Sequence, residues 1–338
     1  MNKQITESCS VNSLKRRVLR FSALILCLAS IFVTSCSSSG NGFRDIVNAV
    51  ESQFPEVFQT PKHLQSSLAS VDSDDVIPVG SAQDLFYASQ EALYAFQPDL
   101  YLKVNSFEEF NQFWDELIKD GALHSAFQNP EVQIEYDNLE PCTVRIALDY
   151  NDTGKVMQKV INSPTPDFDE ALHQELYDSA VSVLEDITNS EMSDREIAVA
   201  VHDYLVMNTI YEDDAETSDQ IDYLATAHSI LIQNQGQCQG YAEAYTLMLT
   251  LSGVECRIVS GSALDQSAKY QPHAWNQVKI DGVWYHVDVT WDDPIPDTGN
   301  QVISTYLLRS DEFFDRDHDW SDLFPYCPED DPIGITDR

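Results

Sequence analysis

The sequence predicts an α+β protein in which helices and strands occupy separate stretches of the chain. Apolar residues recur at helical spacing over 83–96 and 106–119, and the period changes to two after Pro130. Near the C-terminus a helical run that begins at Cys238 is followed by two strand-like runs joined at Asp281-Gly282. About 300 residues beyond the N-terminal leader exceed what one small core usually accounts for, so two domains are expected.

The first domain, predicted over 43–165, is a small α+β accessory domain. After its two helices, alternating apolar residues predict strands at 132–136 and 144–150. The sequence Asn151-Asp152-Thr153-Gly154 predicts a hairpin connection to a further strand at 156–160. This part of the chain carries no recognisable chemistry.

Two prolines between Ser163 and Asp167 indicate a domain boundary. A long amphipathic linker helix is predicted within 166–192, followed by a second domain over 193–328 and a tail at 329–338. The second domain opens with a predicted capping box, Ser193-Asp194-Arg195-Glu196, at the start of another helix.

The N-terminus is typical of an exported protein. Basic residues precede an apolar run from Phe21 to Val33, which is shorter than the roughly 20 residues needed to span a bilayer. Residues 1–35 are therefore predicted to be a signal peptide. The sequence Val33-Thr34-Ser35-Cys36 resembles the lipobox of bacterial lipoproteins.

The lipobox resemblance implies that Cys36 carries a lipid such as palmitate and becomes the mature N-terminus, with 36–42 as a Gly/Ser tether. The expected location is then extracytoplasmic and membrane-anchored, on the periplasmic or cell-surface side. The alternative is ordinary secretion, with Cys36 as one more thiol.

The charge is strongly acidic. The chain has 19 basic and 56 acidic residues, and without residues 1–35 it has 14 and 55, a net charge of −41. Such a surface repels phosphate backbones, so nucleic acid is not expected as a partner.

Four of the seven cysteines remain once the leader and the proposed anchor are set aside: Cys142, Cys238, Cys256 and Cys327. If Cys238 is a free thiol, at most one disulfide can form among the others. Cys142 with Cys327 is the suggested pair, because Cys256 lies in an apolar, strand-like run.

Cys238 is the candidate nucleophile. It lies between Gly236 and Gly240, at the first turn of a predicted buried helix that ends at Gly253. Free backbone amides and the positive end of the helix dipole favour a thiolate there, and the same amides can hold a developing oxyanion.

An imidazole and a carboxylate follow at positions that can be derived by counting. Asp281-Gly282 predicts a two-residue type I′ turn between two strands. Counting outward from that turn sets Trp275 opposite Asp288. By the same count His273 lies opposite Thr290, so His273 and Asp288 share a face at roughly 7 Å between backbones. An aspartate–imidazole hydrogen bond is within reach.

The alternative to a catalytic triad is a metal site. Cys238, His273 and Asp288 are acceptable zinc ligands by type, but the paired, closely spaced ligands of structural zinc sites are missing. Aspartates between 315 and 322 hint at calcium, yet Trp320 stands where an EF-hand needs glycine. The stretch is read as a solvated acidic turn, and no cofactor or metal is expected.

Four separated motifs together resemble the transglutaminase-like superfamily, in its bacterial branch, over about residues 195–328. They are His202-Asp203-Tyr204-Leu205, Gly236-Gln237-Cys238-Gln239-Gly240-Tyr241-Ala242, His273-Ala274-Trp275-Asn276, and Tyr285-His286-Val287-Asp288-Val289-Thr290-Trp291-Asp292-Asp293-Pro294. The resemblance implies a papain-like α+β fold for the second domain and a catalytic Cys238-His273-Asp288 triad. One departure is that Gln239 stands where animal transglutaminases have tryptophan.

The predicted function is that of a lipid-anchored thiol enzyme acting on amide or peptide carbonyls. Cys238 attacks, His273 serves as base and then acid, and Asp288 orients the imidazole. Hydrolysis by a cysteine protease or amidase is favoured over transfer to an amine by a transglutaminase. The alternative is a non-catalytic binding module on the same scaffold. The expected partners are a protein or peptide substrate, cell-wall peptides among them, and the membrane.

Overall fold

The computed structural model describes residues 76–119, 133–137, 139–163, 166–212, 223–264, 268–293 and 302–331. The predicted signal peptide, the lipidation predicted at Cys36 and the predicted tether lie outside these residues. Among the described helices, none has the length and apolar character needed to cross a membrane. The chain divides into two compact units near residue 150. The domain limits drawn from the sequence stay a prediction.

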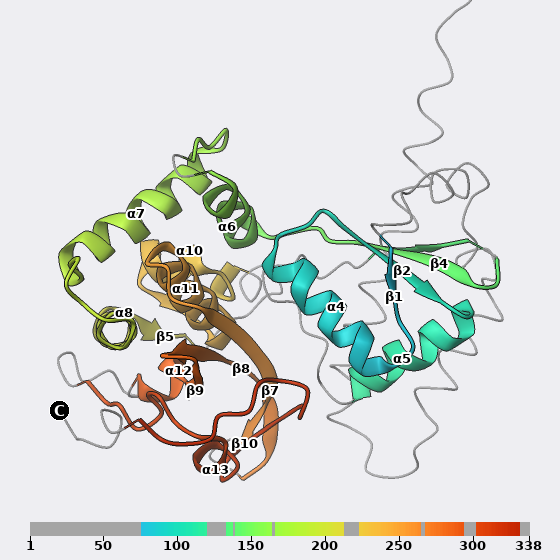
Figure 1. Ribbon diagram of the computed structural model, residues 1–338. Helices are drawn as coiled ribbons and strands as arrows, with labels where there is room; N and C mark the ends of the chain where they lie inside the picture. The colour runs from blue at the N-terminus through green and yellow to red at the C-terminus, as the bar shows by residue number, and fades with distance from the viewer. Residues whose placement is uncertain are drawn as a thin grey trace, which may run out of the picture. The chain divides into compact units, whose positions relative to one another are not determined.

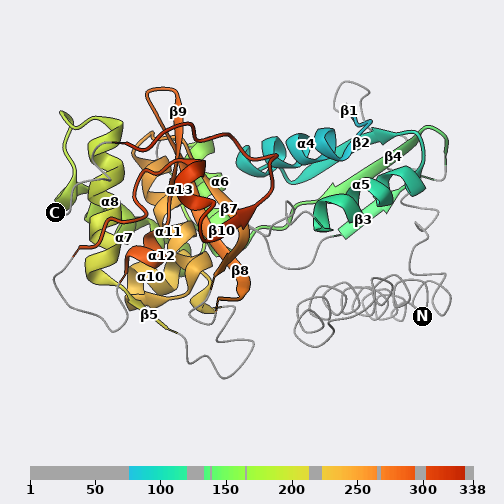
Figure 2. The same cartoon turned by 90° about the horizontal axis from the view of Figure 1, so that it is seen from below.

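The N-terminal unit is built on a four-stranded sheet of order β1-β2-β4-β3, in which only β1 and β2 are parallel (Figures 1 and 2). Its strands are β1 (Ile77–Pro78), β2 (Asp99–Val104), β3 (Gln133–Tyr136) and β4 (Cys142–Ala147). Helix α4 (Ala82–Tyr94) precedes β2 and α5 (Phe107–Lys119) follows it, as the helical spacing predicts.

Side chains of β2 alternate in burial, so that Leu100 and Leu102 are almost fully buried while their neighbours are half-exposed. Helix α4 contacts β2 and buries Leu85 and Phe86. This matches the period-two and period-3.6 patterns of the two segments. The core of the unit is therefore one sheet face with helical cover.

The predicted hairpin at 151–154 is wrong. Asn151 is instead the N-cap of helix α6 (Asp152–Asn162), and its side chain accepts a hydrogen bond from Gly154 N at 2.9 Å. Asparagine is common in turns, but its side-chain oxygen can also accept a hydrogen bond from a backbone amide in the first turn of a helix and so cap that helix. The four-residue spacing of Val156 and Val160, taken for a strand, fits one face of this helix.

The C-terminal unit contains the remaining helices and two sheets. Its longer helices are α6, α7 (Ala171–Ile187), α8 (Asp194–Asn208), α10 (Ala227–Gln233) and α11 (Cys238–Leu251), and the short ones are α12 (Val289–Asp292) and α13 (Asp311–Phe314). The main sheet has the order β10-β7-β8-β9, and a two-stranded parallel sheet joins β5 to β6. The strands are β5 (Ile210–Tyr211), β6 (Gln235–Gly236), β7 (Cys256–Leu264), β8 (Tyr270–Ile280), β9 (Val283–Val287) and β10 (His318–Trp320).

Helix α11 is the centre of this unit. It packs against β7 and β8 on one side and contacts α7, α8 and α10 elsewhere, as the two views in Figures 1 and 2 show. Every residue from Gly240 to Leu249 is buried. A helix that is buried on every side belongs to the core of its unit, and this one carries Cys238 at its first turn.

Other local predictions for this unit are confirmed. Helix α8 begins with a complete capping box between Ser193 and Glu196, and a long helix, α7, lies within the predicted linker segment. Asp281 and Gly282 both have positive φ, and Ile280 pairs with Val283 across the turn. With both units combining helices and largely antiparallel sheets, the α+β fold class is confirmed.

The suggested Cys142–Cys327 disulfide does not form, since both thiols are free. Cys142 lies in β4 of the N-terminal unit, and its Sγ donates to Asp137 O at 3.0 Å. Cys327 belongs to the C-terminal unit, where Gln277 Nε2 donates to its sulfur at 3.3 Å.

Gly261 allows β10 to join the main sheet beside β7. A Cβ at this position would lie 2.3 Å from Asp319 O and 2.8 Å from the Trp275 ring. We expect Gly261→Ala to lower the free energy of unfolding by about 2–3 kcal/mol, because backbone and a buried indole would have to shift. Urea denaturation measures this, with Ser260→Ala in the same strand as control; equal stability of the two variants would contradict the prediction.

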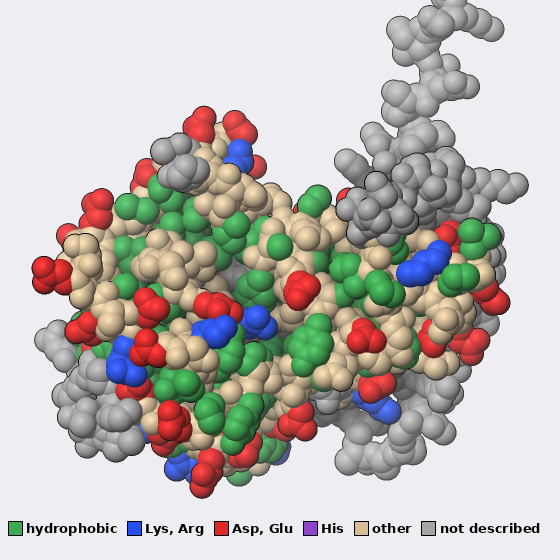
Figure 3. Space-filling model, in the orientation of Figure 1, with side chains coloured by type: hydrophobic (Ala, Val, Ile, Leu, Met, Phe, Trp, Pro, Cys, Tyr) green, Lys and Arg blue, Asp and Glu red, His purple; other side chains and the backbone are tan. Residues whose placement is uncertain are grey.

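Acidic side chains are spread over the face shown in Figure 3, and the described part of that face has no continuous basic patch. This distribution matches the excess of acidic residues in the sequence.

Candidate active site

The nucleophile candidate is positioned by the turn that enters α11. Gln237 N donates to Leu224 O at 2.9 Å, holding the turn against the segment that leads into α10. A Cβ at Gly236 would lie 2.5 Å from the Ile230 side chain, and one at Gly240 would lie 2.7 Å from Leu224 O. Both glycines are therefore required for this close approach.

Cys238 is the first residue of α11 and is partly exposed. The N-cap residue, Gln237, makes no side-chain capping bond. The first-turn amides are thus not capped by the Gln237 side chain, and Cys238 lies at the positive end of the helix dipole, a position that favours an anion.

The pKa of Cys238 is lowered from its ordinary value. Burial acts to raise it, but the hydrogen bond with His273, the charge of that imidazole and a bond from the backbone of Ala274 outweigh burial. The other described cysteines differ: burial raises the pKa of Cys142 and of Cys256 to about 12 and that of Cys327 further. Cys238 is the one described thiol set up to ionise.

His273 and Asp288 form the contact that the sequence predicts. His273 Nε2 lies 2.7 Å from Asp288 Oδ2, and the Asp288 side chain is fully buried. Since Nε2 faces the carboxylate, Nδ1 is the nitrogen left to bond with Cys238. Burial acts to lower the pKa of His273, but Asp288 and Cys238 raise it to about 10.

The route to this contact differs from the predicted one. Strand β9 ends at Val287, whose partner is Asn276, so the pairs Trp275–Asp288 and His273–Thr290 are not formed. Asp288 leaves the strand to cap α12, and its Oδ1 accepts from Trp291 N at 3.1 Å. Counting from the turn correctly predicts that Asp288 lies near His273. The position of its carboxylate is set by its role as the N-cap of α12.

Two further aspartates of the same segment fix α12 to the helices. Asp292 Oδ2 lies 3.1 Å from Nε2 of His202 on α8, and both carboxylate oxygens of Asp292 accept from Tyr306 N at 3.0 Å. Asp293 accepts from the hydroxyl of Tyr241, three residues after Cys238. Sequence reasoning noted these residues as motif members but assigned them no role.

A second imidazole reaches the same carboxylate, and sequence reasoning missed it. His318 Nε2 lies 3.0 Å from Asp288 Oδ2, and its Nδ1 lies 2.7 Å from Asp317 Oδ1. The interpretation of 315–322 as a solvated acidic turn is confirmed for Asp315, Asp319 and Asp322, which are exposed, but the stretch also contains β10 and a fully buried histidine. No spacing rule links His318 to Asp288, which lies 30 residues earlier.

Among the residues that the structure describes, two groups of side chains have the donor types of a metal site: His273, Asp288 and His318, and His286, Asp311 and Cys327. In the first group both imidazoles meet Oδ2 directly at hydrogen-bond distance, so protons fill the space that a cation would need. In the second, the indole N–H of Trp275 donates to His286 Nδ1 at 2.9 Å. The proton of His286 is then on Nε2, facing Asp311 Oδ1 at 3.0 Å. In both groups, nitrogen or oxygen atoms that would bind a metal ion are engaged in hydrogen bonds instead.

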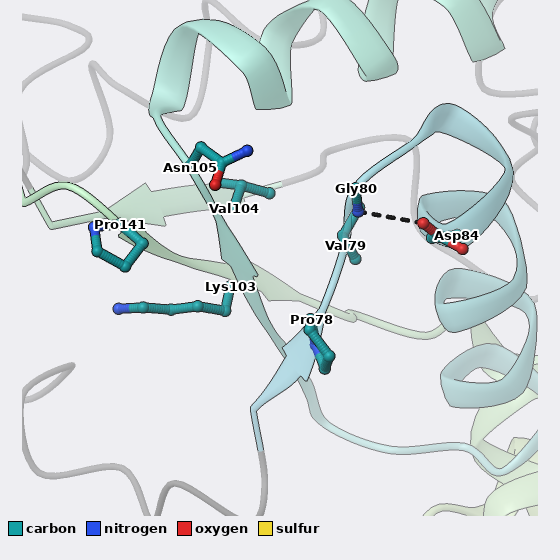
Figure 4. Close-up of a pocket in the computed structure, with 8 residues that line it drawn as sticks. All are labelled: Pro78, Val79, Gly80, Asp84, Lys103, Val104, Asn105 and Pro141. Carbon is teal, nitrogen blue, oxygen red and sulfur yellow. Dashed lines mark hydrogen bonds between the residues drawn. The ribbon is translucent and has the colours of Figure 1, made fainter.

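A separate cavity lies in the N-terminal unit (Figure 4), with a volume of about 440 Å³. Asp84 at its rim accepts from Gly80 N at 3.1 Å, and Lys103 Nζ donates to Thr143 Oγ1 at 2.9 Å. Its lining contains no thiol, histidine or hydroxyl nucleophile. This cavity therefore offers no thiol or imidazole of the kind found at Cys238 and His273.

Comparison with known proteins agrees with this location. Residues 181–289 match the family model described as the transglutaminase-like superfamily. The match contains Cys238, His273 and Asp288; it begins earlier than the resemblance in the sequence indicates and ends before His318.

The chain is similar to kyphoscoliosis peptidase of Homo sapiens, with 33% identity over 98 residues, 26% of this chain and 14% of that protein. It is also similar to kyphoscoliosis peptidase of Mus musculus, with 27% identity over 146 residues, 40% of this chain and 21% of that protein. The chain thus spans 14% and 21% of the length of these relatives.

Solved structures with some likeness include a TGase, at 14% identity and a TM-score of 0.32, covering 73% of this chain and 65% of that one. Another is a putative cysteine protease from Cytophaga hutchinsonii, at 17% identity and a TM-score of 0.29, covering 50% of this chain and 65% of that one. Likenesses of this strength do not bear on function. The family match, and the agreement of its limits with the site, lead to one conclusion: the segment 181–289 of this chain belongs to the transglutaminase-like superfamily.

Proposed function

We propose that this protein is a thiol enzyme that forms a thioester between Cys238 and the carbonyl carbon of an amide or peptide substrate. The observation that carries the proposal is the 2.7 Å contact of His273 Nε2 with a fully buried Asp288 carboxylate, in a ring whose other nitrogen is left to interact with Cys238. The lowered pKa of Cys238, set against three described cysteines with raised values, supports it. Perturbed thiols beside an imidazole are typical of nucleophilic sites.

The steps follow from the positions of the protons. The Cys238 thiolate attacks the carbonyl carbon, and the developing oxyanion is held by backbone amides at the start of α11. His273, protonated on both nitrogens, gives the Nδ1 proton to the leaving amine as the C–N bond breaks. Water or a second amine then attacks the thioester, His273 takes up its proton, and the thiolate leaves.

Asp288 keeps the imidazole in place through both steps. Its carboxylate stays ionised, because the charge and hydrogen bond of His273, followed by the bond from His318, outweigh burial and hold its pKa well below the usual range. A carboxylate bonded to Nε2 fixes the ring orientation and stabilises the imidazolium that proton transfer requires.

Hydrolysis is the favoured outcome, which makes the protein a cysteine protease or amidase acting on protein or peptide, cell-wall peptides among them. The relatives whose names include "peptidase" support this choice, as does Gln239 in the place of the tryptophan of animal transglutaminases. Gln239 Nε2 donates to Glu243 on the next turn at 3.2 Å, so its amide is engaged within α11. The lipobox-like segment supports an extracytoplasmic, lipid-anchored location.

An activity-based thiol probe tests the proposal. The probe is expected to label Cys238 in the wild-type protein and not to label the Cys238→Ala control. Labelling confined to other cysteines would refute a reactive Cys238 and favour a non-catalytic binding module. The acyl-enzyme is then challenged with a labelled primary amine. Release into water identifies a hydrolase, whereas product carrying the amine identifies a transferase.

A further inference from the structure

His318 is a buried histidine that the mechanism above does not require. It begins β10, where it pairs with Ala263 of β7, and its side chain is fully buried. Its ring lies 5.7 Å from that of His273 between centroids, so the two imidazoles approach Asp288 from neighbouring positions.

The two histidines share one carboxylate oxygen. Asp288 Oδ2 is 2.7 Å from Nε2 of His273 and 3.0 Å from Nε2 of His318, while Oδ1 accepts from Trp291 N. Three donors therefore hold a carboxylate that is closed to solvent. A buried carboxylate that loses a partner is strongly disfavoured as an anion.

His318 is itself held from its far side. Its Nδ1 meets Asp317 Oδ1 at 2.7 Å, and the Tyr306 hydroxyl donates to Asp317 Oδ2, also at 2.7 Å. A carboxylate oxygen therefore lies within hydrogen-bond distance of each ring nitrogen. The ring can neither turn nor slide without losing one of these bonds.

Aromatic rings close the space around His318. The rings of Phe314 and Trp291 lie 4.4 and 4.5 Å from it between centroids, and that of Trp275 lies at 5.0 Å. Water has little room to replace a missing donor in such a setting. The titratable groups that face His318 are Asp317, Asp288, His273, Tyr306 and His286.

We propose that His318 is a positioning residue of the active site, which holds the Asp288 carboxylate ionised and aimed at His273. The inference rests on the proposed function, because it concerns how the same nucleophile is activated. It extends the site by one hydrogen-bonded shell, to Asp317 and Tyr306, and gives β10 a role beyond closing the sheet.

The test measures the alkylation rate of Cys238 by iodoacetamide against pH in the full-length protein, with the modified peptide quantified by mass spectrometry. In His318→Gln the Asp288 anion loses the imidazole partner that lies 3.0 Å from its Oδ2, so the His273 imidazolium is less well supported and the thiolate forms at higher pH. We expect the rate constant at pH 7 to fall about fivefold to tenfold, with the midpoint displaced to higher pH.

His286→Gln is the matched control. His286 is also fully buried and stacks on Phe314, with a centroid distance of 4.5 Å, but it bonds Trp275 and Asp311 and does not touch Asp288. It should keep the wild-type alkylation profile whatever stability it loses. A second variant, Asp317→Asn, leaves His318 in place and removes only its outer carboxylate, and should shift the profile in the same direction by less.

The outcomes separate two hypotheses. If wild type shows the lowered midpoint and His318→Gln behaves like His286→Gln, the positioning role is refuted while the nucleophile stands. If His318→Gln fails to fold, Asp317→Asn decides, and an unchanged profile refutes the role. If wild-type Cys238 itself titrates as an ordinary thiol and no variant moves it, the proposed function fails instead.

Discussion

Replacing His273 by alanine is expected to abolish the special reactivity of Cys238. The hydrogen bond and the charge of His273 are the largest influences that lower the pKa of Cys238, and they oppose burial. Without them burial dominates, and the thiol should titrate above its reference value of about 8.5. Turnover of an amide substrate should fall by a factor of about 10³ or more, because both the base and the acid are lost.

Iodoacetamide labelling against pH measures the first effect. Wild-type Cys238 should react readily below the ordinary thiol range, whereas His273→Ala should show a single titration displaced to high pH. His228→Ala is the matched control: His228 is another buried histidine, on α10, and bonds the Tyr223 hydroxyl at 3.3 Å. Identical profiles for wild type and His273→Ala would remove the basis for a catalytic thiol.

The substitution expected to lower the free energy of unfolding most is His202→Gln. The ring of His202 is fully buried between Asp203 Oδ1, at 3.0 Å, and Asp292 Oδ2, at 3.1 Å. Burial acts to lower the pKa of His202, but the hydrogen bonds and charges of the two carboxylates raise it to about 9. His202→Gln leaves the buried Asp292 without its cation, and we expect a loss of about 3–5 kcal/mol in the free energy of unfolding.

The pH dependence of that loss identifies its cause. Because the pKa of His202 is raised from 6.5 to about 9 on folding, its contribution is fully present below pH 6.5 and disappears as pH rises through about 9. The difference between wild type and His202→Gln should therefore shrink over this window. Urea denaturation at several pH values measures it, with His228→Gln as control. A difference that stays constant with pH would mean that packing, and not charge, is responsible.

Local sequence signals predict much of this fold because the physics behind them is local. Gly236 and Gly240 indicate a tight turn before a helix, and the Asp281-Gly282 pair fixes the register of β8 and β9. The error at Asn151 has a physical origin too. Asparagine serves both turns and helix caps, and only the contacts made by the following residues decide between them.

The site is predictable only in part, because its outer contacts join residues that are distant in the chain. Cys238, His273 and Asp288 follow from motif, helix start and turn count. His318 does not, since its approach to Asp288 depends on how β10 docks on β7 beside Gly261. His202 and Asp292 are 90 residues apart in the chain, and the spacing of residues within the two motifs does not predict their contact.

The three aspartates around α12 carry a consequence for when the thiol becomes active. Each reaches a different part of the unit: Asp288 meets β8 and β10, Asp292 meets α8, and Asp293 meets α11. A chain that ends or is still unfolded before residue 288 has Cys238 and its helix but no support for the imidazole. In the proposed mechanism the thiol made early therefore gains its imidazole support only when these contacts of high sequence separation have formed.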